Sequence, residues 1–171
     1  GHFLPPNHPF IANINKRRYK SQEICLLKAR QDRTAETNDR ALYESLHAPD
    51  HPPYNGDYPA WTTAVEMIAN VSKIMKNFTT LHHSHSPEIT FQSRENAHGI
   101  WAMKGLSVWR QDGIEHEFLA FCHYFETYEK RTGKWFFTSR KLKYFYTKSS
   151  PGAIFPPRID NTAAAEKLGG P

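Results

Sequence analysis

The residues whose types and spacing could do chemistry are concentrated in one short run. It is His82-His83-Ser84-His85, followed by Glu88, and a further imidazole comes later at His123. An imidazole with an unperturbed pKa near 6.5 can take up and return a proton around neutrality, and it is also the commonest side-chain ligand of metals. The run therefore admits an acid–base site and a metal site as interpretations.

The metal interpretation is the weaker of the two. On a strand His83 and His85 would share one face, because alternate residues point the same way. Yet Glu88 follows them too soon for a site of the cupin kind, and the glycine signatures of that class are missing. The two cysteines, Cys25 and Cys122, have neither the spacing of a zinc knuckle nor that of a disulfide framework. We expect no metal and no other cofactor.

The composition indicates what a site in this chain would hold. Aromatic residues make up 13% of the 171 residues, so the core or a pocket must be rich in rings. Such a pocket favours a bulky carbon skeleton. One domain accounts for the length, since domains usually run to roughly 100–200 residues.

Charge and hydropathy exclude several partners. The formal charge of +5 is spread over residues 16–33 and 130–148, which also carry regular apolar positions. Without a recognisable binding motif, such charges are usually solvated faces, and we expect no nucleic-acid partner. No run approaches the roughly 20 apolar residues of a membrane helix, and the first residues do not resemble a secretory signal. These features predict a cytoplasmic protein with no membrane partner.

Helices are predicted in the first half of the chain. Residues 20–36 contain no Pro or Gly and place Ile24, Leu27 and Ala35 near helical spacing, and residues 39–47 can form a second, short helix. Apolar residues then recur every three or four positions from Trp61 to Phe78, which predicts a third helix over residues 59–77.

Long strands are predicted after Asn77, where β-branched and aromatic runs begin. The runs cover residues 79–92, 97–110, 114–130 and 134–148, and tight turns separate them. Strands this long cannot stay flat, so the sheet should curl, with the helices packed on its concave side. The predicted fold class is α+β, a cone-shaped barrel of strongly curled antiparallel sheet with a deep apolar pocket between sheet and helices.

Several motifs in this order resemble the SnoaL-like branch of the nuclear transport factor 2-like superfamily. The matching stretches are Thr80-Leu81-His82-His83, Pro87-Glu88-Ile89, Gly99-Ile100-Trp101 to Trp109, Cys122 to Tyr128, and Gly133-Lys134-Trp135 to Leu142. The family includes scytalone dehydratase, bile-acid dehydratase, hexachlorocyclohexane dehydrochlorinase, polyketide cyclases and non-catalytic scaffolds. The resemblance therefore defines the fold better than the reaction.

The resemblance assigns a catalytic dyad. His82 aligns with the histidine that the family's lyases use as base, and Glu36 takes the place of the aspartate that orients it. An adjacent carboxylate fixes the tautomer of an imidazole and stabilises its protonated form. Because Glu36 is one methylene longer than aspartate, Asp32, one helical turn earlier, is a substitute for it.

The general acid is not defined by the resemblance. Gln31 replaces a tyrosine that some members carry, and Arg140 matches a frequent family arginine, which would bind a substrate oxygen or pair with Glu126 or Glu129. The available hydroxyl or imidazole donors are Tyr43, Tyr54, His123 and Ser107.

The resemblance implies a cofactor-independent enzyme, a dehydratase or cyclase acting on a bulky carbonyl-bearing, polyketide- or terpenoid-like intermediate of secondary metabolism. The alternative is a non-catalytic ligand-binding or scaffold domain of the same fold. The residues expected to contact a substrate are Tyr43, Tyr54, Trp61, Met75, Phe78, Trp101, Met103, Phe121, His123, Phe125 and Arg140.

Two further expectations concern assembly and the end of the chain. Trp109, Phe118, Tyr144 and Tyr146 cannot all point inward, so the outer sheet face should carry an apolar patch covered in a homodimer or homotrimer. We expect one domain over residues 1–147. The Pro-rich tail, residues 148–171, is expected to close the pocket as a lid.

Overall fold

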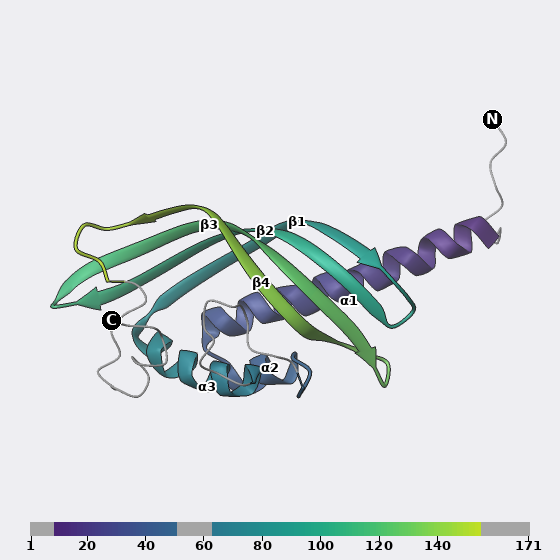
Figure 1. Cartoon of the computed structure of the whole chain (residues 1–171), viewed down its shortest axis with the longest axis horizontal. Helices are drawn as coiled ribbons and strands as arrows, with labels where there is room; N and C mark the ends of the chain where they lie inside the picture. The colour runs from purple at the N-terminus through teal and green to yellow at the C-terminus, as the bar shows by residue number, and fades with distance from the viewer. Residues whose placement is uncertain (1–8, 51–62, 155–171) are drawn as a thin grey trace.

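Three helices precede the sheet in the computed structural model, which describes residues 9–50 and 63–154. They are α1 (Pro9–Thr37), α2 (Arg40–Ser45) and α3 (Ala64–Ile74), and the short 3-10 helix η1 (Met75–Asn77) follows α3 (Figure 1). The predicted start of α1 at residue 20 is wrong. The helix begins at Pro9, where a proline fits because the first helical turn has no hydrogen-bond acceptor for its missing N–H.

The four predicted strands are confirmed, and their ends differ from the prediction by at most one residue. They are β1 (Thr79–Phe91), β2 (Asn96–Gln111), β3 (Ile114–Arg131) and β4 (Lys134–Ser149). They form one antiparallel sheet in the order β1-β2-β3-β4. The sheet is curved and open, so it is the curled sheet that was predicted, without closure into a barrel (Figure 1).

Two-residue turns explain why the last three strands end where they do. The β2–β3 turn is Asp112-Gly113 and the β3–β4 turn is Thr132-Gly133, and all four residues have positive φ. A hairpin turn of this kind needs a left-handed backbone at both central positions, which Asp-Gly provides most readily. The register of β2 against β3 is continuous from Asn96↔Glu129 to Gln111↔Ile114.

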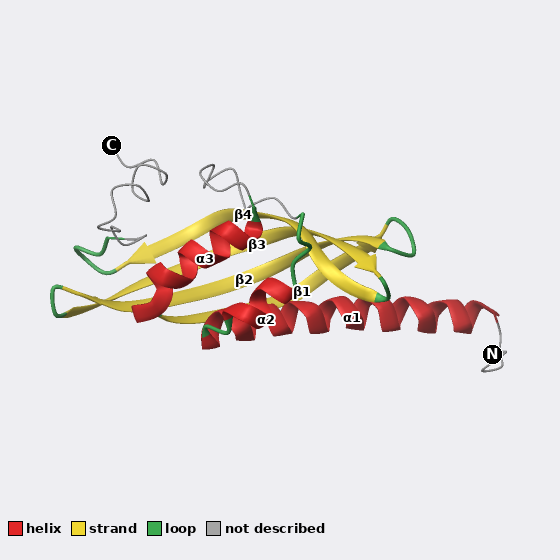
Figure 2. Ribbon diagram, turned by 90° about the horizontal axis from the view of Figure 1, so that it is seen from below, coloured by secondary structure: helices red, strands yellow, loops and turns green. Residues whose placement is uncertain are grey.

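All three helices lie on one side of the sheet (Figures 1 and 2). From α1, Ile24 and Leu27 are buried against the sheet residues Trp101, Cys122 and Phe137. Burial of an aliphatic side chain of this size stabilises a fold by roughly 1.5–3 kcal/mol. The core therefore lies between α1 and the sheet.

A close approach inside this core positions one buried tyrosine. A Cβ added to Gly99 would lie 2.9 Å from the ring of Tyr128, so only glycine fits there. The ring is held in turn by its hydroxyl, which accepts a hydrogen bond from the Trp101 indole N–H at 2.8 Å. The hydroxyl of Tyr128 is thereby directed at Glu126.

The described start of the tail folds back on the β2–β3 hairpin. The Ser150 N–H donates to the Glu117 carbonyl at 3.0 Å, and the Gln111 side chain bonds the backbone of Gly152 and Ile154. The predicted lid segment after residue 154 lies outside the described residues.

Candidate functional site

His82 lies on the face of β1 that is turned toward α1. Thr80, His82 and Ser84 are buried or half-buried on this face, whereas Leu81, His83 and His85 are exposed on the other. This alternation confirms that His82 points inward and that His83 and His85 do not. Within residues 9–50 and 63–154, no group of three His, Cys, Asp or Glu side chains is placed to hold a metal.

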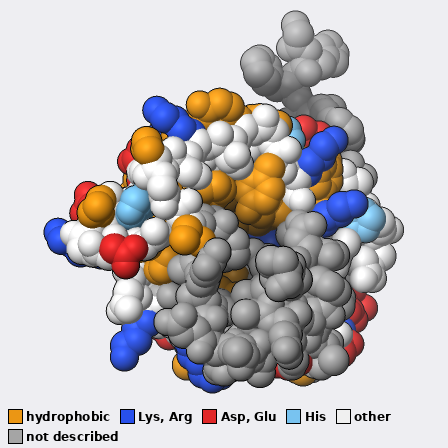
Figure 3. All heavy atoms as spheres, turned by 60° about the vertical axis from the view of Figure 1, so that its left-hand side comes forward, with side chains coloured by type: hydrophobic (Ala, Val, Ile, Leu, Met, Phe, Trp, Pro, Cys, Tyr) orange, Lys and Arg blue, Asp and Glu red, His pale blue; other side chains and the backbone are white. Residues whose placement is uncertain are grey.

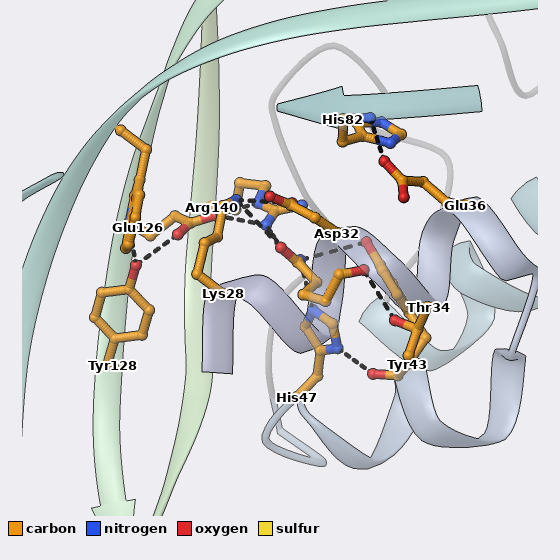
Figure 4. Close-up of polar contacts among 12 residues, drawn as sticks. Lys28, Asp32, Thr34, Glu36, Tyr43, His47, His82, Glu126, Tyr128 and Arg140 are labelled. Atoms are coloured by element: carbon orange, nitrogen blue, oxygen red, sulfur yellow. Dashed lines mark hydrogen bonds and ion pairs between the residues drawn. The ribbon is translucent and has the colours of Figure 1, made fainter. Parts of the chain in front are cut away.

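Glu36 contacts the backbone of His82 and not its ring. Glu36 Oε1 accepts a hydrogen bond from the His82 main-chain N–H at 2.7 Å (Figure 4). Among the described residues, the hydrogen bond between Glu36 and His82 goes to the backbone, so the Glu36–His82 dyad that the resemblance assigns has no direct carboxylate–imidazole hydrogen bond. The longer glutamate side chain reaches the strand backbone instead and fixes the last turns of α1 to β1.

The imidazole of His82 is held in its neutral form. Burial lowers its pKa below 6.5, and the positive charges of Arg140 and Lys28 lower it further, against the opposing effect of the carboxylates of Asp32 and Glu36. The ring atom Nδ1 is buried and has no hydrogen-bond partner in the part of the chain that the structure describes. An unsatisfied buried polar atom costs roughly 1–3 kcal/mol, which a ligand that hydrogen-bonds Nδ1 would recover.

Asp32 is the carboxylate with the strongest effect on this imidazole. It raises the pKa of His82 more than Glu36 does. It lies on the same face of α1, one turn before Glu36, and its carboxylate is 3.7 Å from the ammonium of Lys28. The substitute partner suggested by the sequence therefore has the larger electrostatic effect on the ring.

Beside Asp32, a buried cluster of charges joins α1 to the centre of the sheet. Glu126 on β3 is 2% exposed, and its carboxylate accepts hydrogen bonds from Lys28 at 2.9 Å, Arg140 Nε at 2.7 Å and the Tyr128 hydroxyl at 2.5 Å (Figure 4). Burial alone would raise the pKa of Glu126, but Arg140 and Lys28 outweigh burial and lower it to about 2. We call Lys28, Gln31, Glu126 and Arg140 the buried ion cluster.

Both cations of the cluster rest on the same aromatic ring. The Lys28 ammonium lies 3.9 Å from the centre of the Tyr124 ring, and the Arg140 guanidinium carbon lies 4.2 Å from it. Burial and the nearby Arg140 charge lower the pKa of Lys28 to about 8. The pKa of Arg140 is raised, because Glu126 and neighbouring tyrosines outweigh the opposing effect of burial.

Gln31 extends the cluster to α2. Its carbonyl oxygen accepts from Lys28 at 3.2 Å and from Arg140, while its amide donates to the Tyr43 hydroxyl at 3.4 Å. The amide also lies 3.4 Å from Nε2 of His47. Tyr43 is thus brought to the site, and burial raises its pKa.

The other predicted contact residues are divided between the two faces of the sheet. Trp101 and Met103 are buried on the inner face, and Phe78 stacks on Trp109 with ring centres 5.1 Å apart. Phe121, His123 and Phe125 alternate with the buried Cys122, Tyr124 and Glu126, so they lie on the outer face, away from His82. Tyr54, Trp61 and the side chain of Met75 lie outside the described residues.

Lys28 is the member of the site that sequence reasoning missed. It falls at the helical spacing of the buried positions Ile24, Leu27 and Gln31, so the same periodicity that predicts the core face of α1 includes it. A lysine on such a face indicates a buried anion opposite, which here is Glu126.

Comparison with known proteins identifies the family. The SnoaL-like domain family matches residues 19–141, which include every residue of the site. The chain belongs to the SnoaL-like domain family. No curated protein matches the chain in sequence.

Solved structures of low sequence identity share the fold. A candidate scytalone dehydratase from Novosphingobium aromaticivorans DSM 12444 superposes with a TM-score of 0.70 at 16% identity, covering 85% of this chain and 99% of that one. A hexachlorocyclohexane dehydrochlorinase (LinA-type3) from Novosphingobium barchaimii LL02 gives 0.65 at 18% identity, covering 83% and 97%. The nuclear transport factor 2-like fold is thereby confirmed. None of the described helices is long and apolar enough to cross a membrane.

The buried ion cluster predicts a large cost for removing its anion. Glu126→Gln leaves Lys28 and Arg140 without their carboxylate, and breaking a buried pair typically costs about 3–5 kcal/mol. We expect the free energy of unfolding, measured by urea denaturation, to fall by about that amount. The control Glu129→Gln removes an exposed partner of Arg131 and should cost less than about 1 kcal/mol. A loss below about 1 kcal/mol in Glu126→Gln, no larger than in the control, would show that the cluster does not stabilise the fold.

The electrostatics of His82 predict unequal effects of the two carboxylates. Asp32→Asn should lower the pKa of His82 further than Glu36→Gln does, because Asp32 has the stronger effect on the ring. NMR titration of ¹⁵N-labelled imidazole measures this directly. A larger shift in Glu36→Gln would contradict the assignment.

The lowered pKa of His82 also predicts how stability depends on pH. Between the pKa of His82 in the folded protein and its ordinary value of 6.5, the unfolded chain binds more protons than the folded chain. The free energy of unfolding should therefore rise with pH across that window, and the rise should vanish in His82→Gln.

Proposed function

We propose that the protein is a cofactor-independent acid–base enzyme, a dehydratase or cyclase, in which His82 removes a proton from a carbon next to a carbonyl group. The observation that carries this proposal is the inward-facing imidazole of His82, whose Nδ1 is buried without a hydrogen-bond partner among the described residues and whose pKa Asp32 raises against the effect of burial. Only the neutral ring can accept a proton, and the nearby carboxylate stabilises the imidazolium that forms.

The step conserves atoms and electrons without any cofactor. The C–H bond breaks, its proton goes to the imidazole, and its electron pair forms the carbon–carbon double bond of an enolate. In a dehydration the enolate expels a β-hydroxyl group, which leaves as water after taking up a proton. In a cyclisation the enolate carbon attacks a second carbonyl carbon. Both reactions begin with the same proton removal.

The names of the structural neighbours support an elimination. A dehydrochlorinase removes hydrogen chloride and a dehydratase removes water, and both reactions involve loss of a proton from carbon. The aromatic composition supports a large substrate, so we propose a bulky carbonyl-bearing, polyketide- or terpenoid-like compound.

Proton exchange at a carbon acid tests the proposal without the natural substrate. We expect the protein to speed deuterium incorporation at the α-carbon of 2-tetralone in D₂O, followed by NMR. His82→Ala should slow this exchange about 10²–10⁴-fold, the usual contribution of a general base. The rate should fall as pH drops through the pKa of His82, which lies below 6.5. The matched control His83→Ala removes a neighbouring imidazole on the other face and should keep the wild-type rate.

One observation favours a ligand-binding or scaffold domain as the alternative. The two inner cations, Lys28 and Arg140, are engaged by the carboxylates of Glu126 and Asp32, so their charges are already compensated within the protein. Saturable binding of 2-tetralone, without exchange above the buffer rate and without elimination from scytalone or hexachlorocyclohexane, would select this alternative over the enzyme.

We also propose that the protein forms a homodimer or homotrimer through the sheet. Phe145 and Tyr146 are 61% and 52% exposed, and Tyr144 is exposed as well. Trp109 was expected in this patch but is buried and stacked on Phe78. Figure 3 shows apolar side chains on one face of the molecule, interspersed with Lys and Arg. Exposed aromatic groups of this kind usually mark an interface.

Light scattering tests the assembly. We expect a mass of two or three times 19.8 kDa for the wild type, and a shift toward the monomer for the double variant Phe145→Glu and Tyr146→Glu. Tyr19→Glu, an exposed aromatic site on α1, serves as the control and should not change the mass. A wild-type mass near 19.8 kDa at every concentration would refute the oligomer.

A further inference from the structure

Two neighbouring polar atoms on the inner face of β1 have no hydrogen-bond partner within the described residues. They are Nδ1 of His82 and the hydroxyl oxygen of Ser84, and both are buried. The two residues are separated by one position on the same face of the strand, so their Cα atoms lie roughly 7 Å apart.

The hydroxyl of Ser84 differs from other serine hydroxyls in the chain. Ser45 donates to the Leu42 carbonyl at 2.7 Å, Ser139 contacts the Thr127 hydroxyl at 2.6 Å, and Ser150 accepts from the Glu117 N–H at 2.9 Å. Buried hydroxyl groups are nearly always bonded, and a native exception calls for a functional explanation or an unseen partner. Two exceptions side by side point to one partner that both groups share.

The neighbouring strand β2 places glycine and methionine beside these two atoms. His82 lies opposite Gly105, which has no side chain, and Ser84 lies opposite Met103. A Cβ added to Gly105 would come within 3.2 Å of the Met103 sulfur, so the thioether already lies over this position. Methionine is flexible and adapts to the shape of its neighbours. The surface of β2 beside the two polar atoms is therefore apolar, and its methionine can adapt to the shape of a ligand.

We propose that Ser84 is a catalytic residue whose hydroxyl donates a hydrogen bond to the carbonyl oxygen of the compound from which His82 removes the α-proton. This assignment rests on the proposed function of His82. It defines the ligand as a compound with a carbonyl oxygen and an α C–H on one edge and an apolar skeleton on the other.

The proposed contact would act mainly on the transition state. As the C–H bond breaks and the proton moves to Nδ1, negative charge develops on the carbonyl oxygen, which then accepts the Ser84 O–H bond more strongly. A donor that gains strength in this way raises the rate more than it raises affinity.

The kinetic test compares three serine variants in the 2-tetralone exchange. Ser84→Ala should lower the maximal exchange rate by about 10²-fold, the effect of losing one oxyanion donor, with a much smaller change in the half-saturating concentration. Ser84→Thr keeps a hydroxyl on a strand-compatible residue and should restore most of the rate. Ser86→Ala removes an exposed hydroxyl on the same strand and should keep the wild-type rate.

An equilibrium measurement separates this inference from the proposed function. 2-Naphthol mimics the flat enolate of 2-tetralone, whereas naphthalene lacks the oxygen. Wild-type protein should bind 2-naphthol more tightly, by fluorescence titration, and Ser84→Ala should lose that preference while binding naphthalene unchanged.

The outcomes are distinct. If Ser84→Ala loses the preference for 2-naphthol while the wild type does not speed the exchange of 2-tetralone, the Ser84 contact would be supported and catalysis by His82 refuted. Exchange and 2-naphthol preference that are both unchanged in Ser84→Ala would overturn the Ser84 contact and leave the role of His82 standing. Equal wild-type affinity for 2-naphthol and naphthalene would also overturn the contact, since it would show that a water or another group satisfies the hydroxyl.

Discussion

The burial of Glu126 between Lys28 and Arg140 is the interaction on which the rest of the structure depends. A carboxylate loses several kcal/mol of hydration on burial, and it recovers this only with close, well-oriented cations. The cluster provides them from two other elements, Lys28 from α1 and Arg140 from β4, with Glu126 on the strand between. Loss of any one of the three residues would leave a buried charge poorly compensated, which favours the one alignment of helix and sheet that brings them together.

That alignment continues along α1 to the catalytic candidate. Once Lys28 faces the sheet, Asp32 and Glu36 follow at one-turn intervals on the same side of the helix. Glu36 then meets the His82 N–H at 2.7 Å, which joins the helix to β1 at the other edge of the sheet. The ion cluster and the Glu36 bond are two fixed points on one rigid helix, and Asp32 is held between them.

Much of this architecture was predictable, because its signals are local. β-Branched runs and the pairs Asp112-Gly113 and Thr132-Gly133 define the strands to within one residue. Periodicity, however, shows only which residues share a face, and it does not show which face is inside. On β3 the apolar set with Phe121 and Phe125 lies outside and the set with Glu126 lies inside, because a buried carboxylate becomes acceptable only when Lys28 and Arg140 arrive from distant elements. A search for apolar core residues also misses Lys28, because a lysine belongs to the core only when it is paired with Glu126.

The charges that hold the fold also act on the proposed base. Burial, Arg140 and Lys28 disfavour a proton on His82 and Asp32 favours one, so the pKa of the imidazole is lowered and a counter-charge stabilises its protonated form. In the absence of the cations, the pKa of the ring would be lowered less, because burial would still oppose a proton while Asp32 and Glu36 favour one. In the absence of Asp32, the pKa of the ring would be lower still, and the imidazolium formed on proton removal would lose its strongest counter-charge. The proposed base is subject to both electrostatic effects, and the docking of α1 contributes to each, through Lys28 and Asp32.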